Sequence, residues 1–339
     1  MARIQELLSG RDERLDYYQL IAKYPWIIER NQRCILSPDS DGLLCGLFMA
    51  QYFDWEVDGF YDGKVMLLKR GINVSDCVFL DMEIYRENIR SIGHHMINYN
   101  KRMNLINWGK YNQCIQPNIL RNYDGIHDFR LKYLLATIHL LISIVSNKIR
   151  IELTEDSVAT LFFTDGTFNV LFSYPENVLN WMTFLRIIEE ENPLYKIFCA
   201  NDYTPYKLML EMDKFFRRRD EISVSRERGD RLRISNTDGS PTNCILNTDG
   251  TYLLNEDAVN RIKKFITILE EFTTWKYDDT QWTWDKFDMH KFSKRDFTGQ
   301  GKRLNGTTFR EMIESNPLSW AMTSGDNIEY TLEDPDKLN

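Results

Sequence analysis

The sequence predicts an α/β protein in which a parallel sheet flanked by helices is followed by a smaller α+β region. Short apolar runs of strand length, at residues 33–37 and 77–80, are bounded by turns and by segments with helical spacing of apolar residues. Carboxylates follow both runs, and ligands in open α/β sheets bind at the carboxyl ends of the strands. We assign the sheet domain to residues 1–195 and the α+β region to residues 196–339.

The sheet domain begins with a helical cover over residues 1–30, where apolar residues recur near helical spacing. The strand at 33–37 leads through a tight turn into a helix over 42–53. Residues 55–70 form strands around an Asp-Gly turn, and 77–80 form another short buried strand. This order of strand, helix and strand underlies the α/β assignment.

The second half of the sheet domain is more helical. Asp128 is expected to cap a long buried helix over residues 129–146. The apolar run 158–163 reads as a third strand whose end again carries a carboxylate, and 175–189 reads as a helix. His139 lies within the long helix, so we expect it to be a buried structural residue rather than a ligand.

Organisation changes after about residue 195. Residues 214–233 are rich in arginine, the turn residues of 236–250 indicate a hairpin or small sheet, and 256–274 reads as an amphipathic helix. Trp282 and Trp284 could stack on nucleic-acid bases, although core packing is the commoner fate of tryptophan.

Composition restricts the function. The 339 residues carry 42 basic and 50 acidic side chains and a net charge of −8, so any contact with nucleic acid must be local. The six cysteines form no Cys-x-x-Cys pair, which argues against a zinc site or a disulfide framework. No apolar stretch reaches the roughly 18 residues of a membrane span, and the N-terminus lacks a signal peptide's apolar run. We expect a cytoplasmic protein without membrane contact.

Two carboxylates one residue apart follow the first strand. Asp39 and Asp41 precede Gly42 in the turn, where they repel each other and lose hydration. A bound hard cation would explain them. A second interpretation is that the acids only cap the next helix.

Later residues favour the metal interpretation. Asp81 ends the strand at 77–80, His94 and His95 are adjacent, and Asp165 follows the third apolar run. If the strands are parallel neighbours, their carboxylates meet at one edge of the sheet. Carboxylate and imidazole together suit manganese, iron or zinc.

These segments resemble the four motifs of the DHH phosphoesterase superfamily, over roughly residues 30–185. Ser37–Gly42 is similar to the first motif (His/Asp-x-Asp-x-Asp-Gly), and Asp81 matches the second. Gly93-His94-His95 resembles Asp-His-His, and Asp165 fits the fourth motif. The loop 117–121 and the helix after it resemble the segment between the third and fourth motifs.

The resemblance implies a Mn²⁺-dependent hydrolase with one or two ions, Mg²⁺ being a further possibility, and a metal-activated water as nucleophile. Catalysis would depend on Asp41, Asp81, His94 and His95. One ion would be held by Asp39 and Asp81, and the other by Asp41, Asp81, His94 and Asp165. Substrate would be bound by His95 and Arg121. In the arginine-rich stretch, Arg217, Arg218 and Arg219 are candidates for phosphate contact, and the alternative is that they form a solvated charged face.

The chain departs from the family pattern at three points. Ser37 stands in place of a ligand to the first ion, and Gly93 replaces the carboxylate that would support the histidines. The glycine-rich Gly-Gly-His signature of the family's second domain is missing, so residues 196–339 are expected to be a divergent substrate or interaction region. The first two departures leave a one-ion site and an inactive site open as alternatives to a two-ion site.

Three hypotheses follow. The leading one is a metal-dependent phosphodiesterase that hydrolyses a nucleotide phosphodiester, such as a short single-stranded oligonucleotide. The alternative is a catalytically degenerate relative that binds a nucleotide or a protein partner, with contacts to a partner or to a second copy made through residues 196–339. A third hypothesis, a haloacid-dehalogenase-type phosphatase with Asp39 as nucleophile, leaves both histidines without a role.

Overall fold

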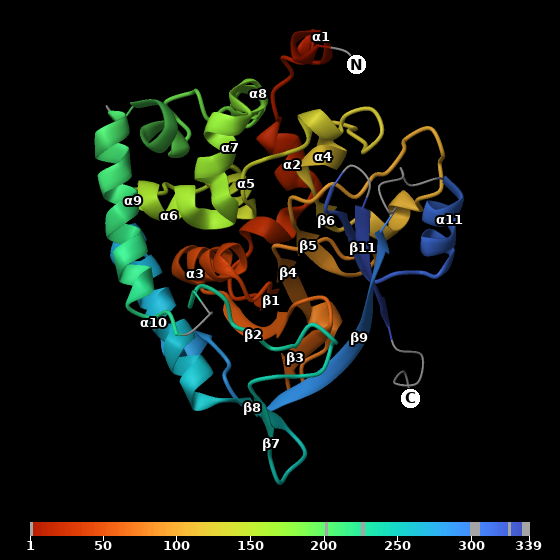
Figure 1. Cartoon of the computed structure of the whole chain (residues 1–339), viewed down its shortest axis with the longest axis vertical. Helices are drawn as coiled ribbons and strands as arrows, with labels where there is room; N and C mark the ends of the chain where they lie inside the picture. Colours follow the sequence, from red (N-terminus) through yellow and green to blue (C-terminus); the bar gives the residue numbers. More distant parts are fainter. Residues whose placement is uncertain (1–2, 201–202, 225–227, 299–305, 325–326, 334–339) are drawn as a thin grey trace.

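The computed structural model describes residues 3–200, 203–224, 228–298, 306–324 and 327–333 (Figure 1). It is an α/β protein with a mixed sheet and helices on its faces, which confirms the predicted class. The sheet runs in the order β10-β11-β9-β3-β2-β1-β4-β5-β6.

The parallel half of the sheet contains the strands expected from the apolar runs. β2 (Glu56–Tyr61), β1 (Arg33–Leu36), β4 (Cys77–Leu80), β5 (Arg90–Ile92) and β6 (Cys114–Ile115) are neighbours in this order, and every pair is parallel. The carboxyl ends of β1 and β4 therefore meet at one edge, as the sequence predicts.

The antiparallel half comes from both ends of the chain. β3 (Val65–Lys69) pairs with β9 (Phe287–Thr298), which pairs with β11 (Asn327–Glu333) and then β10 (Ser319–Met322). The regions on either side of residue 195 thus share one sheet. A small hairpin of β7 (Cys244–Leu246) and β8 (Tyr252–Leu254) attaches to β9 near the expected position.

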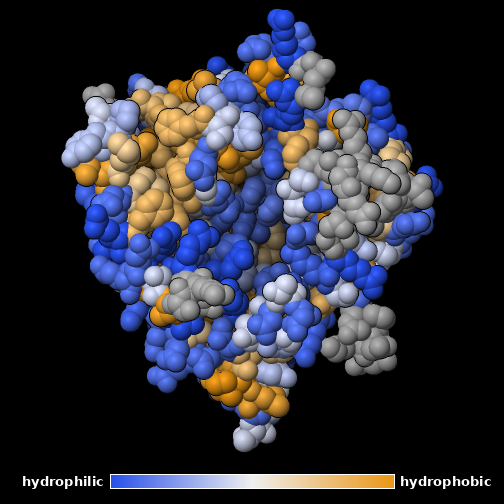
Figure 2. All heavy atoms as spheres, viewed as in Figure 1, coloured by the Kyte–Doolittle hydropathy of each residue, from blue (hydrophilic) through white to orange (hydrophobic). Residues whose placement is uncertain are grey.

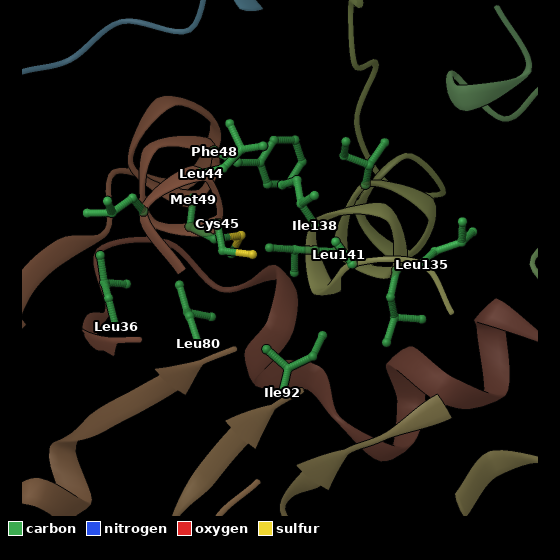
Figure 3. Packing of buried hydrophobic residues seen from close by; sticks show 14 of the residues in the cluster. Leu36, Leu44, Cys45, Phe48, Met49, Leu80, Ile92, Leu135, Ile138 and Leu141 are labelled. Carbon is green, nitrogen blue, oxygen red and sulfur yellow. The ribbon is translucent and has the colours of Figure 1, made fainter. Parts of the chain in front are cut away.

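Two helices cover the site face of the parallel strands. α3 (Ser40–Phe53) and α5 (Thr137–Val145) pack against each other above β1, β4 and β5. In Figure 3, Leu44, Phe48 and Met49 of α3 and Ile138 and Leu141 of α5 face one another over the strands. This apolar burial, at roughly 25 cal/mol per Å², fixes the first turns of both helices at the edge of the sheet.

The remaining helices surround this core. They are α1 (Ile4–Leu8), α2 (Tyr17–Lys23), α4 (Pro117–Leu120), α7 (Thr167–Ser173), α8 (Pro175–Phe184), α9 (Pro205–Asp220), α10 (Glu256–Thr273) and α11 (Gly306–Glu314). α1 and α2 confirm the helical N-terminal cover, and α10 confirms the helix expected over 256–274. α8 ends at Phe184, before the expected limit of 189. None of the helices described here is both long and apolar enough to cross a bilayer.

Two predictions about secondary structure are wrong. Residues 158–163 belong to a helix, α6 (Ser157–Phe163), rather than to a strand. Every residue of α6 is buried, so its apolar run carries no periodicity that would distinguish helix from strand. The expected helix over 129–146 is a short 3₁₀ turn (Phe129–Leu131) followed by α5, with a non-helical link between them.

Side chains occupy the backbone donors of this link. The Tyr133 N–H donates to the Asn118 side chain at 2.7 Å, and the Ala136 N–H donates to His139 Nδ1 at 3.0 Å. Asp128 pairs with Arg11 rather than capping a helix. α5 therefore begins at Thr137, whose amide faces the site.

Candidate metal centre

The turn after β1 requires glycine at position 42. A Cβ atom there would lie 2.0 Å from the carbonyl oxygen of Ser37, so any other residue would displace the turn. Asp39 is the N-cap of α3, and its Oδ1 accepts the Gly42 N–H at 3.3 Å. The helix-cap interpretation is therefore correct for Asp39, while Asp41 has a different environment.

Asp41 is fully buried against the N-terminus of α5. Its carboxylate accepts the Thr137 N–H at 2.6 Å and the Ile138 N–H at 3.1 Å. These are the donors that a helix leaves unpaired in its first turn, and the helix dipole stabilises a negative charge there. The hydroxyl of Thr137 donates to Asp81 Oδ1 at 2.7 Å, so one residue positions both carboxylates.

Asp81 and Asp165 adopt strained backbone conformations. Asp81 follows β4 with φ of 65°, and Asp165 has φ of 51° in the turn between α6 and α7. Residues other than glycine seldom adopt this left-handed region, although Asp and Asn tolerate it best. Both carboxylates lie close to that of Asp41 in the first turn of α3.

Four side chains converge at this edge of the sheet. Asp41, Asp81, His94 and Asp165 each offer a ligand atom, and these atoms all lie within 4.8 Å of one another. His94 Nδ1 lies 3.3 Å from Asp81 Oδ1, and His94 Nε2 lies 3.1 Å from Asp165 Oδ2. The group contains three carboxylates and one imidazole, and these are suitable ligands for a divalent cation.

The group is electrostatically frustrated. Burial raises the pKa of Asp41 well above its usual value, and the charges of Asp81 and Asp165 raise it further. The pKa of Asp81 is also raised, first by burial and then by Asp39 and Asp165. A divalent cation would favour the ionised form of each carboxylate, so the donor set fits a metal both in chemistry and in charge.

Asp39 lies outside this group. Its second oxygen pairs with Arg231 at 3.2 Å, and the backbone N–H of Leu232 donates to the Pro38 carbonyl at 2.8 Å. Residues 228–233 are thereby attached to the turn after β1, and in Figure 1 this segment passes in front of α3. Arg231 therefore forms an ion pair with the carboxylate that the resemblance assigns to the other ion.

Glu83 supplies a carboxylate that the sequence analysis did not consider. It is only 3% exposed, accepts the backbone N–H of His95 at 2.7 Å and lies 3.2 Å from His95 Nδ1. A Cβ atom on Gly93 would lie 2.5 Å from Glu83 Oε1, so Glu83 fills the space where a side chain at 93 would begin. The only sequence signal for this role is an acid two residues after Asp81.

Glu83 also affects the pKa of His95. Burial lowers the pKa of His95, but the neighbouring Glu83 carboxylate offsets that effect, and the net shift of the pKa is upward. His95 lines a cavity beside the cluster. The ring of His94 stacks on the ring of His95, with centroids 4.3 Å apart, and faces the carboxylates. The two adjacent histidines therefore face different partners.

Two cavities adjoin the four-residue group. The first, here called the His95 cavity, has a volume of about 510 Å³ and contains Ser37, Asp39, Asp81, Glu83 and His95 in its wall. The second, here called the Phe168 cavity, has a volume of about 1010 Å³. Asp39, Arg231 and Arg233 line both cavities, so cationic side chains lie at the junction between them. The Phe168 cavity is also lined by Asp165, Phe163, Phe168, Asn169, Phe216, Arg219 and Arg228.

The predicted substrate-binding arginines fall in different places. Arg219 lines the Phe168 cavity. Arg217 pairs with Asp213, and Arg218 pairs with Glu271 and Glu221; neither is among the residues lining the two cavities. Of the three predicted arginines, Arg219 therefore lines the Phe168 cavity, together with Arg228, Arg231 and Arg233, which the sequence analysis did not assign to substrate.

Arg121 is a structural residue. Its side chain is fully buried, pairs with Glu13 at 2.8 Å and packs 4.8 Å from the ring centroid of Trp181. It is not among the residues lining either cavity. Burial and packing against aromatic rings indicate a structural role for Arg121. The structure therefore does not support the predicted contact of Arg121 with substrate.

His139 and Trp282 confirm the structural interpretations. His139 is fully buried, and burial lowers its pKa to about 4, so the ring is neutral near pH 7. Trp282 is 4% exposed and stacks on Trp284 with ring centroids 5.9 Å apart. All six cysteines are free, as expected from their spacing.

Comparison of the chain with family models, with curated proteins and with solved structures gives no match. The functional argument therefore depends on the residues of the site.

Proposed function

We propose that the chain is a metal-dependent phosphoesterase that hydrolyses a nucleotide phosphodiester. The observation that carries this proposal is the convergence of Asp41, Asp81, His94 and Asp165 beside two cavities with shared arginines. These four residues are the set that the resemblance to the DHH superfamily assigns to one ion.

Mn²⁺ is the proposed cofactor. Three carboxylates and an imidazole suit it, and the pKa values of Asp41 and Asp81 are raised first by burial and then by neighbouring carboxylates, whose charge a cation would offset. When bound, the ion would lower the pKa of a coordinated water and stabilise charge on a phosphoryl oxygen.

The protein's own cations would bind and orient the phosphate. Arg231 and Arg233 lie where both cavities meet, and a guanidinium can hold two phosphate oxygens at once. His95 faces the same space, and its raised pKa favours the protonated ring, which donates a hydrogen bond to an anion. Glu83 orients this ring from behind.

We propose that the four-residue group holds one ion tightly. At the other expected position only Asp39 and Asp81 supply carboxylates, Ser37 replaces a stronger ligand, and Asp39 is paired with Arg231. The same departures support the alternative of a binding protein without catalysis. Calorimetric titration with Mn²⁺ tests the ion count, since we expect one tight site per chain.

Hydrolysis assays test the function directly. The purified chain should hydrolyse at least one substrate among single-stranded DNA, short RNA, cyclic dinucleotides and pyrophosphate, with Mn²⁺ required and EDTA inhibitory. Glu329→Gln is a matched control, because it neutralises a carboxylate in the wall of the His95 cavity outside the cluster. One tight Mn²⁺ site without hydrolysis of any substrate would favour the alternative.

A further inference from the structure

The Phe168 cavity has phenylalanines as well as arginines in its wall. Phe163, Phe168 and Phe216 come from α6, α7 and α9, and Asp165 of the four-residue group lies in the same cavity. Phe216 lies edge-on to Phe168 and Phe163, with ring centroids 6.1 and 5.9 Å apart. In Figure 2, apolar residues gather over α7 and α9 beside a hydrophilic hollow.

Arg219 connects the aromatic and cationic parts of this wall. Its guanidinium lies 4.9 Å from the ring centroid of Phe216 and 5.7 Å from that of Phe163. Arg219 is also paired with Asp220 of the same cavity at 2.7 Å. A guanidinium held over aromatic rings has a flat face, and such faces stack on nucleobases. The neighbouring Asn169 is exposed and offers amide donors and acceptors of the kind that base edges require.

We propose that the Phe168 cavity is a nucleobase subsite, in which the base stacks against Phe168 and Arg219 while its phosphate is held by Arg231 and Arg233. The inference rests on the proposed function for the position of the phosphate. If a base binds there, the substrate is a nucleotide that carries a base. Pyrophosphate and simple phosphate esters, which have no base, are then excluded as the preferred substrates.

The size of the cavity supports a base rather than a phosphate alone. Its volume of about 1010 Å³ lies at the upper end of the roughly 300–1,000 Å³ that small-molecule sites occupy. A phosphate needs only the cationic part of the wall, which leaves the phenylalanine part without a role. A planar apolar ring joined to an anion matches both parts in one ligand.

An outer apolar groove adjoins the subsite. It has a volume of about 480 Å³, shares Phe168, Asn169 and Phe216 with the Phe168 cavity, and extends to Phe172, which is 74% exposed. Phe172 does not line the Phe168 cavity, so it is a control for loss of an aromatic surface outside the subsite.

Two ligands that differ only in the base test the inference. We expect adenosine 5′-monophosphate to bind the Mn²⁺-loaded chain about tenfold more tightly than ribose 5-phosphate by calorimetry, because one stacked base contributes this much affinity. Phe168→Ala should remove the preference without weakening ribose 5-phosphate. Phe168→Trp should restore it, and Phe172→Ala should leave it unchanged.

Three outcomes would overturn the subsite. These are equal affinity for the two ligands in the unaltered chain, no binding of either at millimolar concentration, or a preference lost in Phe172→Ala but kept in Phe168→Ala. If Phe168→Ala proves unfolded by its thermal melt, Asn169→Ala replaces it, because Asn169 is an exposed residue of the same wall. The base preference is a binding result, so it can hold even if no phosphodiester is hydrolysed, and the two proposals fail separately.

Discussion

The four-residue cluster and the arginine segment 228–233 face the same space but are held in different ways. Asp41 is fully buried, and two backbone amides of α5 fix its carboxylate. Arg231, by contrast, has a side chain 67% exposed and is attached through Asp39 and the adjacent Leu232 amide. One part is a rigid centre, and the other is a surface segment resting on it.

This difference suggests that the cluster and the segment have different roles. A metal centre needs ligands fixed by their surroundings, which the parallel strands and helix N-termini provide. Recognition of a substrate tolerates more variation, and loops placed over a rigid scaffold commonly supply it. Changes to the cluster should therefore remove activity, whereas changes to the segment should tune it.

The largest expected effect is at Asp81. Asp81→Asn keeps the shape of the side chain, and Asn tolerates the positive φ, so the fold should persist. We expect loss of tight Mn²⁺ binding by calorimetry and a fall in kcat/KM of roughly 10³-fold. Glu329→Gln should keep the Mn²⁺ affinity and the kcat/KM of the unaltered chain. Mn²⁺-dependent turnover at full rate in Asp81→Asn would refute the cluster assignment.

Glu83 should have an intermediate effect through His95. Glu83→Ala removes the carboxylate that orients the ring, and we expect activity to fall about 10–100-fold while calorimetric Mn²⁺ affinity changes little. Adding Gly93→Asp returns a carboxylate near the same space, but its Cβ would also lie 2.9 Å from the backbone carbon of Met82, so we expect only a small part of the loss to be recovered. Equal damage in the single and double variants would show that Glu83 acts only through packing.

Arg231 tests the recognition side of the comparison. Arg231→Ala should raise KM about tenfold, as expected for a charge-assisted phosphate contact, with a smaller change in kcat. The matched control is Arg217→Ala, because Arg217 forms an exposed helical pair with Asp213 and lines neither cavity. A KM that rises equally in both variants would place the phosphate elsewhere.

The smallest effect concerns stability against pH. Because the folded-state pKa values of Asp41 and Asp81 are raised, the folded protein binds more protons than the unfolded chain between about pH 4 and those raised values. Metal-free protein should therefore lose stability as pH rises through this window, by a few degrees in Tm. Mn²⁺ should reverse this trend. A metal-free Tm that rises over the same window would contradict the repulsive cluster.

The sequence analysis predicted the parts of the molecule with local signals. The strand ends at Asp41 and Asp81 were predicted from short apolar runs and the chain order of strand, helix and strand, and the predicted α/β class is confirmed. The structure brings Asp165 and His94 beside them. Asp165, however, was named from an apolar run taken for a strand that is in fact α6, and His94 was named from the adjacent pair of histidines, so their place beside Asp41 and Asp81 did not follow from a correctly predicted element.

Other features depend on contacts that no local pattern encodes. The link before α5 is an example, because the Tyr133 amide donates to the side chain of Asn118, which lies 15 residues earlier in the chain. Among Arg217, Arg218 and Arg219, successive residues of a helix point in different directions, so only Arg219 reaches a cavity. The carboxylate of Glu83 could be assigned to His95 only once β4 and the segment after β5 were placed side by side.

The pairing of β3 with β9 constrains how the chain folds during synthesis. Leu67 and Met289 are partners in this ladder although they come from opposite ends of the sequence. A nascent chain therefore completes β1 and β4 long before the neighbour of β3 is made, and the open edge of β3 is a template for pairing with other chains. Fragments that end before β9 should be prone to aggregation, and the protein should depend on chaperones until its last strands emerge.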